Sequence, residues 1–226
     1  MSGMAWHRQF NNGSENRMMF GKRIDLGKRP FFTEMPVFTL GAQQADGQLG
    51  IGCTKTTNGP AVACYLSLVH TLIDAHYWRG RGVPYGAGIA STIDRELFVA
   101  ENRRELIAEI RLGWPVCGRR LVREMDGNTA SLAIVVRQAI VGEVMGFELA
   151  EPVLEEIDQL HERAGIFAWR EAYRNMASWD EQRVLASTAR ALNAIETTRA
   201  KRADCDEIAL YDAEFEQWHF VPLSAI

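Results

Sequence analysis

The sequence predicts an α+β fold: a single domain in which a mixed or antiparallel sheet with hairpins packs against several helices, including a C-terminal antiparallel helix pair. Three observations predict it. Short extended segments occur near both ends of the chain, helical periodicity dominates residues 151–195, and no strand-helix-strand unit repeats. The chain has 226 residues, 47% of them apolar, so it can bury a sizeable core.

The first thirty residues differ in charge from the rest. Residues 1–30 hold six Lys or Arg against Glu15 and Asp25, a balance of +4, whereas the whole chain has a formal net charge of −4. Their centre, the stretch NNGSEN, is rich in turn-forming residues. We therefore expect a flexible basic arm over residues 1–30 and one α+β domain over residues 31–226.

The basic arm is a candidate binding segment. Lys22, Arg23, Lys28 and Arg29 form two clusters beside apolar or aromatic residues, a composition that suits nucleic acid or another anionic surface. A solvated tail that packs its few aromatic residues on the domain is the alternative.

The first part of the domain is expected to contain two strands followed by a helix. Residues 34–42 and 47–56 are extended segments joined at the turn signal Asp46-Gly47. Pro60 suits the first turn of a helix that continues to Trp78, and the glycine-rich residues 79–88 end that helix as a loop.

The middle of the domain combines a helix with a hairpin. Residues 96–100 suggest a strand, or else the start of one longer helix from Asp94, and residues 103–112 have helical spacing. A hairpin is expected between residues 117–125 and 129–136 around Asp126-Gly127-Asn128. Residues 138–149 suggest a further strand.

The last third is expected to be helical and then extended. A helix begins at Glu151 with Pro152 in its first turn, and its apolar stripe reaches Ala168. Ser178 with Glu181 forms a capping box for a second helix, which makes an antiparallel pair with the first. Residues 206–212 and 214–223 are expected strands.

The richest chemistry lies in residues 67–88. On a helix, Ser67, His70 and Asp74 share the face opposite the apolar stripe, so His70 and Asp74 suggest a surface pair. A serine hydrolase is disfavoured because a nucleophile needs an exposed turn and an oxyanion hole. An enzyme built on His70, Asp74 and Tyr85 is kept as the alternative hypothesis.

Metal and anion binding are further alternatives for the same stretch. His70 and His76 lie about 240° apart around a helix, so they do not face one ion, and His76 is expected on the buried stripe. A site completed by His161 or a distant carboxylate is left open. Arg79 and Arg81 beside Tyr85 suit a small anion, against the alternative of a simple exit loop. The basic run at 199–202 is attributed to the dipole at a helix end.

A second candidate surface lies on the predicted helix pair. Its residues combine aromatic rings with guanidinium groups, the composition of interface anchors. They are Trp169, Arg170, Tyr173, Arg174 and Trp179.

Cysteine spacing and hydropathy bear on the compartment. The four cysteines are far apart and lack paired metal-ligand spacing, so neither a zinc site nor any other cofactor is expected. No apolar run reaches transmembrane length and no secretory signal is apparent, which predicts a cytoplasmic protein.

The leading hypothesis is a protein without catalytic activity that acts through contacts with another protein or with itself. An enzyme or small-ligand binder centred on residues 67–88 is the alternative, and a nucleic-acid binder acting through residues 1–30 is the weaker one.

Overall fold

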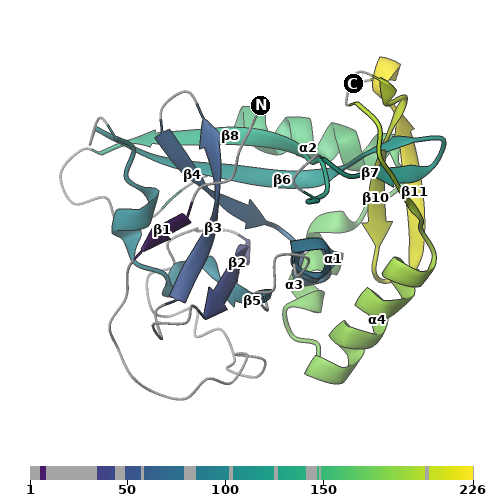
Figure 1. Cartoon of the computed structure of the whole chain (residues 1–226), viewed down its shortest axis with the longest axis horizontal. Helices are drawn as coiled ribbons and strands as arrows, with labels where there is room; N and C mark the ends of the chain where they lie inside the picture. The colour runs from purple at the N-terminus through teal and green to yellow at the C-terminus, as the bar shows by residue number, and fades with distance from the viewer. Residues whose placement is uncertain are drawn as a thin grey trace.

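The protein is an α+β molecule in which helices pack against a large mixed sheet (Figure 1). The computed structural model describes residues 6–8, 35–43, 49–56, 59–78, 85–101, 104–124, 127–140, 147, 149–201 and 204–225. Of the expected basic arm, only β1 (Trp6–Arg8) is described, and its backbone pairs antiparallel with β3. The division into an arm and one domain stays a prediction.

An antiparallel group of strands forms the left half of Figure 1. It contains β2 (Phe38–Gln43), β3 (Leu49–Thr56), β4 (Gly59–Tyr65) and β5 (Tyr85–Ile89). β2 pairs with β3, β4 and β5, so it lies in the middle of this group. The extended segments expected on either side of Asp46-Gly47 therefore correspond to β2 and β3.

The central strand is β6 (Glu105–Cys117), which runs parallel to β4 and antiparallel to β8 (Leu132–Ala139) and β10 (Glu207–Asp212). The prediction of a helix over residues 103–112 is therefore wrong. All but the two end residues of β6 are buried, and a strand buried on both faces has a continuous apolar run in place of an alternating pattern. Its leucine and isoleucine spacing consequently resembled a helix.

Two further predictions fail around the first helix. Pro60 lies in β4, and the helix α1 (Leu68–Trp78) begins eight residues later than Pro60. Residues 61–65 are buried and mostly small, as suits an inner strand, so the helical spacing applies only beyond Tyr65. After the undescribed residues 79–84, the predicted exit loop becomes strand β5.

The segment between β5 and β6 contains 3-10 turns. These are η2 (Ala90–Thr92) and η3 (Arg95–Phe98), so residues 96–100 form neither the predicted strand nor a long helix from Asp94. The Asp94 carboxylate instead accepts the backbone N–H of Glu96 at 2.9 Å and starts η3.

The short strand β7 (Arg120–Val122) turns back on β6. Gly118 and Arg119 both have positive φ, 56° and 58°, the pattern of a tight two-residue hairpin turn. Next to the expected turn, Arg123 and Thr129 form an isolated antiparallel β-bridge. Beyond it the predicted hairpin does not continue, because β8 pairs with β6 and not with β7. Of the strand predicted over residues 138–149, residues 141–146 and 148 lie outside the described residues.

The C-terminal helical region contains three helices. They are α2 (Glu151–Arg163), α3 (Trp169–Met176) and α4 (Glu181–Asn193). The start at Glu151 and the place of Pro152 are confirmed. The first predicted helix ends early because Gly165 has a φ of 79°, and Asp180, not Ser178, caps α4 by accepting the N–H of Arg183 at 2.8 Å.

The last strands form the right-hand side of Figure 1. β10 pairs antiparallel with β11 (Gln217–Pro222), and the chain then enters η5 (Leu223–Ala225). β9 (Thr197–Thr198) lies parallel to β7. Since α4 ends at Asn193, the helix-dipole explanation of the basic run at 199–202 is wrong.

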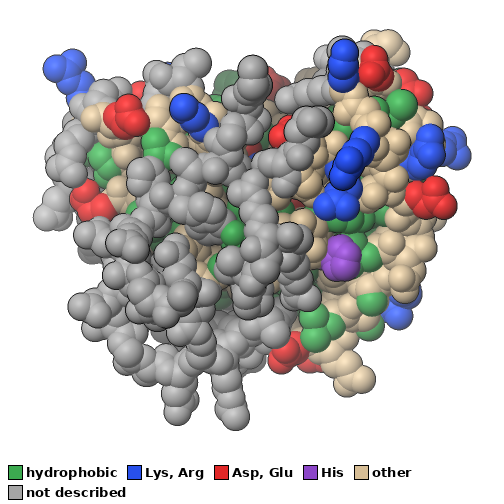
Figure 2. All heavy atoms as spheres, in the orientation of Figure 1, with side chains coloured by type: hydrophobic (Ala, Val, Ile, Leu, Met, Phe, Trp, Pro, Cys, Tyr) green, Lys and Arg blue, Asp and Glu red, His purple; other side chains and the backbone are tan. Residues whose placement is uncertain are grey.

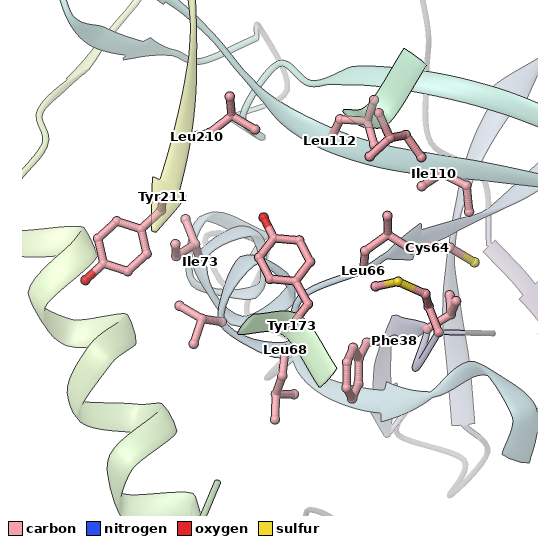
Figure 3. Close-up of a cluster of buried hydrophobic side chains, with 14 of the residues drawn as sticks. Phe38, Cys64, Leu66, Leu68, Ile73, Ile110, Leu112, Tyr173, Leu210 and Tyr211 are labelled. Carbon is pink, nitrogen blue, oxygen red and sulfur yellow. The ribbon is translucent and has the colours of Figure 1, made fainter. Parts of the chain in front are cut away.

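The apolar core surrounds α1. Figure 3 shows side chains from β2, β4, β6, β10 and α3 gathered about this helix, among them Phe38, Ile110, Tyr173 and Leu210. Strands of the antiparallel group and of the C-terminal hairpin therefore pack on one helix, which also contacts α4.

Close packing of β6 on β10 depends on Gly113. A Cβ atom at this position would lie 2.7 Å from the carbonyl oxygen of Ala209. We expect Gly113→Ala to lower the free energy of unfolding by about 2 kcal/mol, within the usual cost of overpacking. Gly88→Ala is the control, since a Cβ added at Gly88 would meet no atom within 4 Å. Equal stability of the two variants in urea unfolding would contradict this packing.

Candidate functional site

The most concentrated group of polar side chains lies inside the molecule, on α1. Ser67, His70 and Asp74 are 0%, 3% and 0% exposed. Their predicted position on a solvent-facing surface is therefore wrong. The reason is that the sheet and the other helices enclose α1 on several sides, so its polar face also meets protein.

Asp74 is the centre of this group. Its Oδ2 accepts hydrogen bonds from the Tyr65 hydroxyl at 2.7 Å and from Arg111 Nη1 at 3.0 Å. Its Oδ1 accepts from Trp114 Nε1 at 2.6 Å and from Thr129 Oγ1 at 2.7 Å. Four donors surround one carboxylate, so this buried charge is well compensated.

Arg111 links Asp74 to a second carboxylate. Its Nε donates to Glu109 Oε1 at 3.1 Å, and its Nη2 donates to Thr54 Oγ1 at 3.2 Å. Thr54 in turn donates to the same Glu109 oxygen at 2.9 Å. We call Asp74, Arg111, Glu109, Thr54 and Tyr65 the Asp74 cluster.

Burial shifts the proton affinities in the Asp74 cluster. Burial raises the pKa of Tyr65 well above its usual value, so this hydroxyl stays a donor. For Arg111, burial favours the neutral form, but Tyr65, Asp74 and Glu109 outweigh it and the pKa is raised. The guanidinium therefore stays charged, and the cluster binds α1 to β3, β4 and β6 electrostatically.

His70 connects α1 to strand β10. Its Nε2 lies 2.7 Å from the carbonyl oxygen of Tyr211. Because a carbonyl only accepts, Nε2 carries the proton. Burial lowers the pKa of His70 to about 4, so the ring is neutral at pH 7. Its ring also packs edge-on against Trp114 and Tyr173.

His161 forms a second buried histidine site between α2 and α3. Its Nδ1 lies 2.8 Å from the Ile157 carbonyl, so Nε2 is the acceptor for the Tyr173 hydroxyl at 3.0 Å. Its ring stacks on Trp169 at 4.5 Å between centroids. Burial lowers its pKa to about 4.

His70 and Asp74 do line one small hollow. The other residues around it are Tyr65, Arg111, Leu112, Gly113, Trp114 and Ser131. The space among them is too narrow for a water molecule. This arrangement positions elements of the fold and, in this conformation, offers no volume for a substrate.

Of the remaining residues of the predicted small-ligand site, Tyr85 does not line this hollow. Tyr85 is 3% exposed in β5, and its ring packs edge-on against Trp78. Arg79 and Arg81 lie outside the described residues, as do the basic-arm residues Lys22, Arg23, Lys28 and Arg29.

Among the side chains that the structure describes, the histidines do not gather into a metal site. His76 is exposed, contrary to its predicted place on the buried stripe. His161 uses both ring nitrogens within the fold. Within the described ranges, no three His, Cys, Asp or Glu side chains are placed to hold a metal ion.

The predicted aromatic interface is largely interior. Trp169 and Tyr173 are 2% and 3% exposed and belong to the core, so they are not surface anchors. Arg170 pairs with Asp158 at 2.5 Å. Arg174 is exposed, and half-buried Trp179 lies beneath the Arg183 guanidinium at 3.8 Å. The combination of aromatic and arginine residues predicted a surface, whereas the structure places both Trp169 and Tyr173 in the core.

The exposed aromatic residues are different ones. Phe167, between α2 and α3, is 78% exposed, and Phe215, in the β10–β11 turn, is 72% exposed. The sequence placed Phe167 on a helix stripe and Phe215 in a strand. Phe167 comes two residues after Gly165 and Phe215 comes directly before Glu216, and both Gly165 and Glu216 have positive φ. Gly165 is a turn signal in the sequence, whereas Glu216 is not.

Comparison with protein families, curated proteins and solved structures finds no match to this chain. None of the described helices is long and apolar enough to cross a membrane.

Removing the charge at Asp74 tests the role of the Asp74 cluster. We expect Asp74→Asn to lower the free energy of unfolding by about 3–5 kcal/mol, because Arg111 stays buried without its main counter-charge. Glu216→Gln removes a carboxylate from the exposed pair with Arg190 and should cost less than about 1 kcal/mol. Denaturant unfolding of both variants compares them. A similar small loss in both would show that the cluster is not important for stability.

The buried histidines predict acid sensitivity. Their pKa values are lowered from 6.5 to about 4 in the folded protein, so the unfolded chain binds protons first as the pH falls. Their contribution is fully present above pH 6.5 and is lost towards pH 4, by about 1.4 kcal/mol per pH unit for each histidine. Urea unfolding across this range measures the slope. His161→Gln should reduce it, and an unchanged slope would contradict the assignment.

Proposed function

We propose that this is a cytoplasmic protein without catalytic activity that acts by binding another protein. The observation that carries the proposal is Phe215, a large aromatic side chain that is 72% exposed at the tip of the last hairpin. Exposed aromatic anchors are enriched where proteins bind one another. The two buried cysteines, Cys53 and Cys64, act as small apolar side chains and suit a reducing compartment.

Phe215 is presented on an ordered turn. Asp212 Oδ1 accepts the backbone N–H of Glu214 at 2.9 Å and that of Phe215 at 3.2 Å. Glu216, at a φ of 57°, completes the turn and pairs with Arg190 on α4. Since the turn is fixed before binding, a partner does not have to order it.

The neighbouring helix α4 extends this surface. The β10–β11 pair packs on α4 through two bonds, from Tyr211 to the Ser187 carbonyl at 3.2 Å and from Trp218 Nε1 to the Ala191 carbonyl at 3.0 Å. The outer side of α4 carries Leu185, which is 42% exposed. The proposal also includes an antiparallel arrangement of the C-terminal helices. Arg174 and Trp179, near the junction of α3 and α4, would then belong to the same binding surface.

The other functions have less support. On the face drawn in Figure 2, the described Lys and Arg side chains are mixed with Asp and Glu. This face therefore has no continuous positive patch that would favour nucleic acid. An enzyme of residues 67–88 would need His70 and Asp74 for chemistry, whereas their hydrogen bonds go to Tyr211 and to the Asp74 cluster.

Two matched phenylalanine variants test the proposal. We expect affinity capture from extracts of the source cells to recover a stoichiometric partner with the wild type and with Phe167→Ser, but not with Phe215→Ser. Both side chains are exposed, so neither change should alter the fold. Capture of the same proteins by all three chains, or of none by any, would contradict the proposal.

A further inference from the structure

We propose that β11 forms a homodimer by pairing antiparallel with β11 of a second copy, with the two-fold axis at His219. The interface is separate from the exposed Phe215 side chain, so the inference goes beyond binding of another protein and does not depend on it.

The first step is that β11 ends the sheet. The strand order finishes with β10 and β11, and within the described part of the chain β11 pairs with β10 alone. Figure 1 shows β11 outside β10 on the right of the molecule. Edge strands present free backbone groups to another strand.

The register shows which backbone groups are free. Leu223 N donates to the Asp206 carbonyl at 2.8 Å, so the Glu207–Pro222 pair is of the type without direct hydrogen bonds. Pairs alternate along an antiparallel ladder, so Leu210 and His219 bond to each other. The N–H and C=O groups of Trp218 and Phe220 therefore point away from β10.

The free groups are self-complementary. A two-fold axis at His219 places Trp218 opposite Phe220 of the second copy, and each of these pairs can exchange both of its backbone hydrogen bonds. An axis at Trp218 would instead pair Phe220 with Glu216, which lies outside the strand at a positive φ. An axis at Phe220 would pair Trp218 with Pro222, which has no N–H to donate. Only the register centred on His219 lets Trp218 and Phe220 exchange all of their outward hydrogen bonds with each other.

The side chains favour the same register. Trp218 and Phe220 are half-buried and lie on one face of β11. The two-fold axis therefore places the Trp218 ring of each copy next to the Phe220 ring of the other copy. Cross-strand aromatic pairs stabilise sheets. Arg119 already lies over Phe220 with its guanidinium carbon 5.2 Å from the ring centroid, which holds this ring in place.

Devices that block edge pairing are absent from this strand. Residues 217–221 contain no lysine, no proline and no bulge, and Pro222 comes only at the end. The aromatic-His-aromatic centre is nearly symmetric, and this is why a second copy is the occupant that we infer.

A register-specific cross-link tests the dimer. At the two-fold axis, residue 219 faces itself in a pair without direct hydrogen bonds, with Cα atoms about 4.5 Å apart, which is within disulfide range. We expect His219→Cys to give a covalent dimer on mild oxidation, in a chain where Cys117 and Cys205 are replaced by serine. Gln217→Cys is the control, since residue 217 would face Val221. Equal cross-linking of both variants, or none with His219→Cys, would overturn the register.

Sedimentation velocity provides a second test without cysteine. The wild type should dimerise as its concentration rises to about 300 μM, a range that reveals weak association. Phe220→Pro removes an outward N–H and no bond to β10, so it should stay monomeric with an unchanged circular dichroism spectrum. A monomeric wild type, or dimerisation of Phe220→Pro equal to wild type, would overturn the proposal. Phe215→Ser should still dimerise, so failure of the dimer and failure of the Phe215 surface are distinguishable.

Discussion

The buried carboxylate of Asp74 is the interaction on which the arrangement of this fold depends. It receives hydrogen bonds from β4, from two places on β6 and from the segment before β8, through Tyr65, Arg111, Trp114 and Thr129. A charge at 0% exposure is tolerated only because all these donors converge. The Asp74 cluster therefore fixes both the position and the rotation of α1, and the apolar core packs around a helix that is already oriented.

This arrangement separates the polar interior from the surface that can bind other molecules. His70 ties α1 to β10, and β10 supports the strand and turn that carry Trp218 and Phe215. His70 and Asp74, the side chains best suited to catalysis, thus stabilise the fold. Exposed aromatic and backbone groups lie instead at the C-terminal hairpin. Both proposals, the Phe215 surface and the β11 dimer, use this hairpin because it is ordered from within and open on its outer side.

The sequence predicted elements that carry a distinctive local signal and failed where an enclosed element lacks one. The start of α2 was found from its amphipathic stripe and Pro152, and the last two strands were found from their aromatic and β-branched residues, although β10 is buried along almost all of its length. β6 and the polar face of α1 show no contrast between a buried and an exposed side, so a strand was assigned as a helix and a buried face as a surface. His70 and Asp74 were recognised as unusual, but their partners lie up to 141 residues away in sequence, and no local spacing reveals such contacts.

A double-mutant cycle between Asp74 and Arg111 tests the central claim most directly. The free energy of unfolding would be measured for the wild type, Asp74→Asn, Arg111→Gln and the double variant. If the contact holds α1 in the sheet, the double variant will lose less than the sum of the single losses, with a coupling of about 2 kcal/mol or more. Additive losses would mean that the two side chains act independently and would contradict this account.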